Sequence, residues 1–260
     1  MSEASERSHW AVVGEEFTRI LASGLPVRPS YTFCVLHAAS VASRTGVPAI
    51  SVLEFGVAGG NGLIALEAVA GEAERVFGVG VGVYGFDTGQ GLPPPRDYRD
   101  APFWMERGDF PMDQDALRAR LERAELLLGD VARTVPAFLE SGAAPVGFIS
   151  FDLDYYSSTR DALRLFEGEA AAFLPRVLCY FDDVHFYPWG DSIGARLAIR
   201  EFNEERPTRK IDALHGMRYI FGPEHREERW LEGLYLAHLF DHPRYDEFEG
   251  TQLVRRMDLD

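Results

Sequence analysis

Two apolar runs of the sequence each end in a pair of aspartates. The run VGFISF leads into Asp152 and Asp154, and the run VLCYF leads into Asp182 and Asp183. A stretch with helical spacing separates the two runs, and strands that alternate with helices form parallel sheets with helices on both faces. Because the carboxyl ends of parallel strands meet at one edge of a sheet, the four carboxylates are expected to gather there, where open α/β sheets bind ligands.

The rest of the chain continues this alternation of strand-like and helix-like segments. It predicts an α/β fold with a doubly wound, mostly parallel sheet. The length of 260 residues suits one such domain with additions, and we expect a helical N-terminal extension in residues 1–48. We expect strands at 49–55, 79–87, near 128, at 146–151 and at 177–181, strand character at 211–221 and 234–240, and helices at 62–70, 115–127, 158–173 and 192–205.

The composition excludes several classes of partner. A formal charge of −15 argues against nucleic acid, because the protein surface would repel a phosphate backbone. No apolar stretch approaches the roughly 20 residues that span a bilayer, and the first residues lack the pattern of a signal peptide, so we expect a cytoplasmic protein without membrane contact. Cys34 and Cys179 lie in apolar surroundings, where we expect buried, reduced thiols.

The segment EFGVAGGNG predicts a tight turn from a strand into a helix. Its glycines let the backbone turn sharply and approach a ligand, and the following helix begins with free N–H groups. A dinucleotide fingerprint would place a glycine where Ala58 stands and an acid about 20 residues further on. Asp87, at the end of the second expected strand, lies too far along the chain for that pattern, which weakens a nicotinamide dinucleotide as the ligand.

Several segments together resemble a known family. LEFGVAGGNG resembles motif I of the class I S-adenosylmethionine-dependent methyltransferases. YGFDTGQGLP, FDLDYYSST, FDDV and GARLAIREFNEE, in this order, are similar to the macrocin O-methyltransferase type, which includes metal-dependent sugar O-methyltransferases of antibiotic biosynthesis. The resemblance spans residues 49–205. It implies a Rossmann-like, seven-stranded methyltransferase domain over 49–260, a lid within 1–48, a homo-oligomer, and methylation of a hydroxyl on a sugar or natural-product intermediate.

The resemblance also implies which residues hold S-adenosyl-L-methionine. Asp87 would accept hydrogen bonds from the two ribose hydroxyls, a pairing that suits a carboxylate and a diol. The methionine end would lie against the glycine turn, and the adenine would lie near the end of the third strand. The implied cofactor-binding residues are Glu54, Gly56, Ala58, Gly60, Asp87, Gly129, Asp130 and Asp152.

The four carboxylates at the two strand ends point to a divalent cation. Without one, their mutual repulsion would raise their proton affinities and cost stability, and ligands made only of oxygen favour magnesium, manganese or calcium over zinc. By the resemblance, Asp152, Asp182 and Asp183 become the ligands of a divalent cation, with Mg²⁺ the expected ion. Asp154 becomes the general base, and His185 is an alternative base or a contact for the acceptor.

Aromatic residues near the expected site suggest where a small-molecule acceptor would bind. The long loop at 91–110 and the segment at 185–191 carry side chains that stack on sugars or on aromatic rings. The sequence does not distinguish a glycoside from a phenol. The residues are Phe103, Trp104, Phe186, Tyr187 and Trp189.

Three other functions fit parts of the pattern. FDLDYYSST is similar to the D-x-D motif of haloacid dehalogenase-type phosphatases, although that motif usually lies on the first strand of its domain. A nucleotide-sugar transferase could use D-x-D to hold a metal, but it leaves the glycine turn unexplained. A non-catalytic scaffold with a cofactor-binding fold is disfavoured because all four carboxylates are present.

Overall fold

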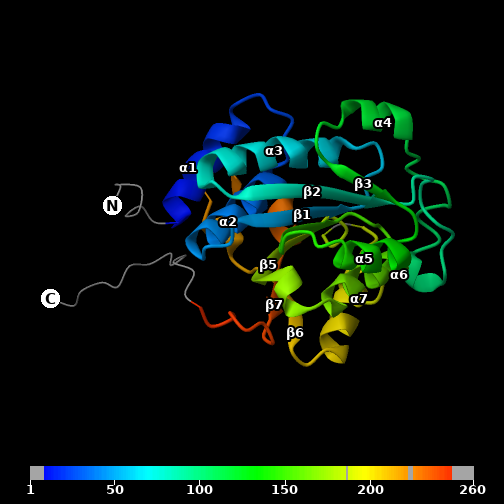
Figure 1. Cartoon of the computed structure of the whole chain (residues 1–260). Helices are drawn as coiled ribbons and strands as arrows, with labels where there is room; N and C mark the ends of the chain where they lie inside the picture. The colour runs from blue at the N-terminus through cyan, green and yellow to red at the C-terminus, as the bar shows by residue number, and fades with distance from the viewer. Residues whose placement is uncertain (1–8, 186, 222–224, 248–260) are drawn as a thin grey trace, which may run out of the picture.

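A computed structural model of the chain describes residues 9–185, 187–221 and 225–247. Its centre is a seven-stranded sheet with the order β3-β2-β1-β4-β5-β7-β6, and helices cover both faces (Figure 1). The strands are β1 (Ala49–Phe55), β2 (Gly80–Asp87), β3 (Glu125–Leu128), β4 (Val146–Phe151), β5 (Phe173–Phe181), β6 (Arg209–Ala213) and β7 (Leu234–Leu239). The helices are α1 (His9–Leu21), α2 (Pro29–Arg44), α3 (Asn61–Phe77), α4 (Gln114–Arg120), α5 (Val131–Glu140), α6 (Tyr156–Ala162) and α7 (Gly194–Glu205).

The predicted fold class is confirmed. Strands β3, β2, β1, β4 and β5 pair in parallel, while β7 is antiparallel to both β5 and β6. Since β7 alone is reversed, the carboxyl ends of β5 and β6 lie at the same edge of the sheet. That edge is also where β1, β2 and β4 end.

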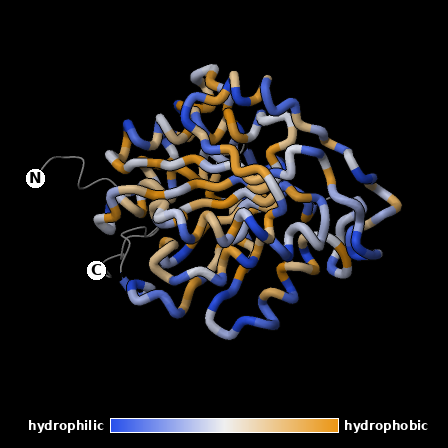
Figure 2. Tube along the Cα trace, turned by 45° about the vertical axis from the view of Figure 1, so that its right-hand side comes forward, coloured by the Kyte–Doolittle hydropathy of each residue, from blue (hydrophilic) through white to orange (hydrophobic). Residues whose placement is uncertain are grey.

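Each face of the sheet packs against its own set of helices. On one face, α1, α2 and α3 pack in a layer, and α2 is buried along nearly its whole length. On the other face, α5, α6 and α7 cover a second apolar cluster. Figure 2 shows hydrophobic strands at the centre and more hydrophilic segments outside. The expected helical N-terminal segment is thus present as α1 and α2, and the division of the chain at residue 48 stays a prediction.

Three predicted segments end earlier than expected. The helix predicted for 115–127 ends at Arg120, because Glu67 on α3 accepts hydrogen bonds from the next N–H groups, those of residues 122–124, and holds them in an extended path toward β3. The helix predicted for 158–173 ends at Ala162 and continues as short 3-10 turns. The strand predicted for 211–221 stops at Ala213, and the chain then turns through Gly216, whose φ is 82°.

Two further expectations concern the cysteines and the membrane. Cys34 and Cys179 are both free and buried, as predicted. Within the described residues, no helix combines the length and the apolar character needed to cross a bilayer.

Candidate functional site

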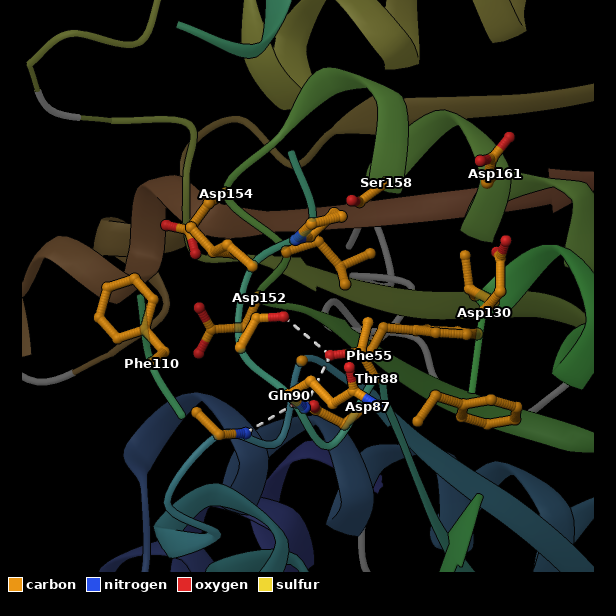
Figure 3. A pocket seen from close by; sticks show the side chains of 18 of the residues that line it. Phe55, Asp87, Thr88, Gln90, Phe110, Asp130, Asp152, Asp154, Ser158 and Asp161 are labelled. Carbon is orange, nitrogen blue, oxygen red and sulfur yellow. Dashed lines mark hydrogen bonds between the residues drawn. The ribbon is translucent and has the colours of Figure 1, made fainter. Parts of the chain in front are cut away.

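A cavity of about 360 Å³ opens at the carboxyl edge of the sheet, between the loops that follow β1, β2, β3 and β4. Figure 3 shows Asp152, Asp154 and Phe110 toward one end of this cavity and Asp130 and Asp161 toward the other. Most of the residues predicted to bind a cofactor line it. These are Gly56, Ala58, Asp87, Gly129, Asp130 and Asp152.

The glycine turn is shaped by close contacts within the protein. Gly56 has a φ of 86°, and a Cβ atom built there would lie 1.7 Å from the backbone oxygen of Asp152. Gly60 has a φ of 82°, and its Cβ would meet the side chain of Leu117 at 2.1 Å. Gly60 is not among the residues that line the cavity. Gly56 therefore brings the end of β1 against Asp152 after β4 at the cavity wall, and Gly60 brings the start of α3 against Leu117 of α4.

Asp87 ties the glycine turn to the end of β2. Val57 and Ala58 donate their backbone N–H groups to Oδ2 of Asp87, each at 2.9 Å, and Gly89 donates to Oδ1 at 2.7 Å. Figure 3 shows this carboxylate facing the cavity. A carboxylate has about four acceptor positions, so Asp87 retains capacity for a ligand hydroxyl while it holds the turn.

Glu54 lies beneath the glycine turn and does not line the cavity. Tyr31 donates its hydroxyl to Oε1 of Glu54 at 2.7 Å, and the Tyr31 oxygen accepts hydrogen bonds from Ser150 at 2.8 Å and Arg28 at 3.2 Å. Oε2 of Glu54 is buried and has no hydrogen-bond partner among the described residues. Burial raises the pKa of Glu54 to about 8, although the Tyr31 hydrogen bond opposes the rise.

Gly129 and Asp130 follow β3 and line the cavity, and Figure 3 shows Asp130 at the end away from Asp152. Gly129 has a φ of 138°. Asp130 caps helix α5, because its Oδ1 accepts the N–H of Ala132 at 2.9 Å. The cap fixes the side chain at the cavity wall and leaves the second carboxylate oxygen available.

The predicted acidic cluster assembles. One carboxylate oxygen from each of Asp152, Asp182 and Asp183 lies within 4.8 Å of the others. Asp154 donates its backbone N–H to Oδ2 of Asp183 at 2.8 Å, and its φ of 57° takes the chain out of the extended conformation. Because β4 ends at Phe151, the chain has left strand pleating by Asp154, and this allows Asp152 and Asp154 to line the same cavity.

The carboxyl groups of Asp152, Asp154 and Asp183 have raised pKa values. Burial, and then the charges of Asp182 and Asp154, raise the pKa of Asp152 to about 7. Burial and the charge of Asp182 raise the pKa of Asp154 to about 6, and burial raises the pKa of Asp183 well above its usual range. A divalent cation would relieve this repulsion, and the donor set of three carboxylates suits a hard ion such as Mg²⁺.

This cluster should make the metal-free protein less stable as the pH rises. Asp152 has a pKa of about 7 when folded and a reference value of 3.8. Between these values the folded state keeps a proton that the unfolded chain has released, so the free energy of unfolding falls as the pH rises from about 4 to about 7. Urea unfolding across this range measures the slope. Asp152→Asn should make the slope shallower, and an unchanged slope would contradict the prediction.

The site can be compared with known proteins. No family model and no curated protein sequence matches this chain. Among solved structures, the chain is similar to the O-methyltransferase NovP, with a TM-score of 0.51 and 18% identity over 68% of this chain and 72% of that one. It is also similar to the calicheamicin methyltransferase CalS11, with a TM-score of 0.51 and 20% identity over 87% of this chain and 91% of that one. The chain has the fold of the class I methyltransferases.

The methyltransferase fold places His185 apart from the cavity that Asp154 lines. His185 lines a different cavity, together with Arg196 and Glu232. Burial lowers its pKa, although the negative charge of nearby Asp182 opposes this effect. His185 therefore lies beside the acidic cluster on the side away from the cavity at the glycine turn, and its role as a base stays a prediction.

The aromatic residues predicted to frame the acceptor are partly brought together. The rings of Trp104 and Tyr187 meet edge to face, with centroids 5.2 Å apart, and both side chains are exposed. Phe103 is exposed, whereas Trp189 is buried and its ring lies against Gly194. Phe186 lies outside the described residues.

Several residues that the sequence did not single out support the site. Tyr180 on β5 donates its hydroxyl to Oδ1 of Asp182 at 2.8 Å. Asp100 in the long loop is fully buried and accepts the N–H of Ser157 at 2.7 Å and its hydroxyl at 2.9 Å, so the loop caps the helix that follows Asp154. Asp100 and Ser157 lie 57 residues apart in the sequence, so no local pattern predicts their contact, whereas Tyr180 stands only two residues before Asp182.

Proposed function

We propose that this protein is an S-adenosylmethionine-dependent and divalent-metal-dependent O-methyltransferase. Its acceptor would be a hydroxyl of a small molecule, a sugar or a natural-product intermediate. The observation that supports this most is the placement of the cluster Asp152, Asp182 and Asp183 beside a cavity walled by the glycine turn. Both lie at the carboxyl edge of a methyltransferase fold.

The polar groups that line the cavity suit S-adenosylmethionine. Asp87 would accept a hydrogen bond from a ribose hydroxyl, and Gly129 and Asp130 would lie near the adenine. The methionine end would lie toward Gly56 and Asp152. This orientation directs the methyl group to the acidic end of the cavity, where Asp154 also lies.

Asp152, Asp182 and Asp183 would hold the metal. Bound there, a divalent cation would lower the pKa of the acceptor hydroxyl. Asp154 would accept the hydroxyl proton, and its pKa of about 6 suits a base that works near neutral pH. The acceptor oxygen would then form a bond to the methyl carbon as the carbon–sulfur bond breaks, which yields the methyl ether and S-adenosylhomocysteine.

The decisive test is calorimetry with S-adenosylhomocysteine. Saturable binding with one site per chain is expected. Absence of binding would exclude the proposed class. Methyl transfer that continues unchanged in a chelator would exclude the metal role, and release of phosphate from a generic ester would instead support the phosphatase function.

Tyr180→Phe should weaken metal binding without changing cofactor binding. The tyrosine hydroxyl holds Oδ1 of Asp182, and loss of such an orienting hydrogen bond typically costs about 10–100-fold in metal affinity. Titration with Mn²⁺, followed by electron paramagnetic resonance, measures the metal affinity directly. Tyr235→Phe is the matched control, since Tyr235 lies on the adjacent strand β7. Equal metal affinity in the two variants would contradict the role of Tyr180.

A further inference from the structure

A second cavity, here called the polar cavity, opens at the same edge of the sheet. It has a volume of about 610 Å³ and lies between the segments that follow β5 and β6, the first turn of α7 and the segment before β7. Its wall is rich in polar and charged side chains, and His185 is the one among them with a role proposed so far. They include His185, Arg196, His215, Arg218, Glu232 and Tyr235.

The order of the strands places the two cavities on opposite sides of the acidic cluster. The cavity at the glycine turn lies over the ends of β3, β2, β1 and β4, the acidic cluster follows β4 and β5, and the polar cavity lies over β5, β7 and β6. Along this edge of the sheet, the acidic cluster therefore lies between the cavity at the glycine turn and the polar cavity.

The polar cavity borders the segment that directly follows the acidic cluster. Val184 and His185 line it, and they follow Asp183 in the chain. Gly233, which follows the lining residue Glu232, lies against the end of β5, because a Cβ atom there would lie 2.6 Å from the backbone oxygen of Phe181. The wall of the polar cavity thus packs against the strand end that carries Asp182.

Transfer of a methyl group to oxygen needs the attacking oxygen opposite the sulfur, with the methyl carbon between them. If the cofactor fills the first cavity, the acceptor must approach from the far side of the cluster, where the polar cavity lies. We propose that the polar cavity binds the body of the acceptor and that Arg196 and Arg218 recognise an anionic group on it, a phosphate or a carboxylate. This inference rests on the proposed function.

The two arginines are suited to recognise an anion. Arg196 pairs with Asp191 at 2.6 Å, and Arg218 pairs with Glu232. Asp191 is 72% exposed in its side chain, and exposed pairs of this kind contribute only about 0–1 kcal/mol, so a ligand anion can replace the carboxylate. The guanidinium fork matches phosphate and carboxylate groups. Against a net charge of −15, such local cations are what would attract an anionic acceptor.

Arginine side-chain NMR with inorganic phosphate tests the site in the metal-free full chain. Saturable shifts are expected for the Nε–Hε signals of Arg196 and Arg218. Arg164 is the control, because it is a similarly exposed arginine paired with Glu167 on the turn after α6. Arg218→Gln should weaken phosphate binding about tenfold, the loss expected for one charge-assisted hydrogen bond, whereas Arg164→Gln should leave it unchanged.

The inference would be overturned if phosphate caused no change in the NMR signals of Arg196 and Arg218, or if it changed the signals of all three arginines equally. Titration with acetate distinguishes a preference for carboxylate from one for phosphate. Parallel calorimetry with S-adenosylhomocysteine separates the two proposals. Cofactor binding without a phosphate response would refute the anion site alone, and a phosphate response without cofactor binding would refute the proposed methyltransferase.

Discussion

Replacing Asp182 by asparagine should abolish methyl transfer and leave the affinity for S-adenosylhomocysteine nearly unchanged. Asp182 contributes to the cluster with Asp152 and Asp183, and it is not among the residues that line the cofactor cavity. Lewis-acid stabilisation is worth several kcal/mol, so the expected loss in turnover is about 10³-fold. Turnover assays with calorimetry of S-adenosylhomocysteine and Mn²⁺ measure the three quantities separately.

Two variants make the result for Asp182 specific. Asp154→Asn should also lose turnover but should keep Mn²⁺ binding, because Asp154 is proposed as the base. Asp191→Asn removes an exposed carboxylate from the same segment after β5 and should bind Mn²⁺ like the unmodified protein. Retention of full turnover in Asp182→Asn, or a large loss of cofactor affinity, would contradict the assigned role.

The site could be located from the sequence because its residues follow strand ends. β1 and β4 have the predicted bounds, and β2 and β5 end where predicted, at Asp87 and Phe181. A buried strand is recognisable from its continuous apolar run. The residue after such a run lies at the carboxyl edge in any parallel sheet, and this is why the acidic cluster was predicted without knowledge of the strand order.

The parts that the sequence did not reveal depend on contacts between distant segments. Glu54 was predicted to face the cofactor, yet it lies beneath the turn with Tyr31 of α2. Glu67 ends helix α4 because it accepts hydrogen bonds from three N–H groups that lie more than 50 residues further along the chain. No local sequence motif around either carboxylate shows whether it binds other groups of the protein or a ligand. Similarly, the glycine turn predicted a close approach, but only the fold identifies Asp152 as the neighbour of Gly56.

Because Gly56 approaches Asp152 so closely, Gly56→Ala should strongly reduce both stability and cofactor binding. The new Cβ would lie 1.7 Å from the backbone oxygen of Asp152, and the φ of 86° is unfavourable for any residue with a side chain. Either β4 must move away from β1 or the turn must refold, and both would displace Asp152 from the cluster. We expect a loss of at least about 3 kcal/mol in the free energy of unfolding, together with loss of cofactor binding.

Gly59→Ala is the matched control within the same turn. A Cβ atom at Gly59 meets no atom within 4 Å, and its φ lies outside the left-handed region. A surface substitution of this kind changes the free energy of unfolding by about 0.5 kcal/mol or less. Urea unfolding and calorimetry with S-adenosylhomocysteine compare the two variants. If Gly56→Ala matched Gly59→Ala in both measurements, the contact between β1 and Asp152 would not be what assembles the site.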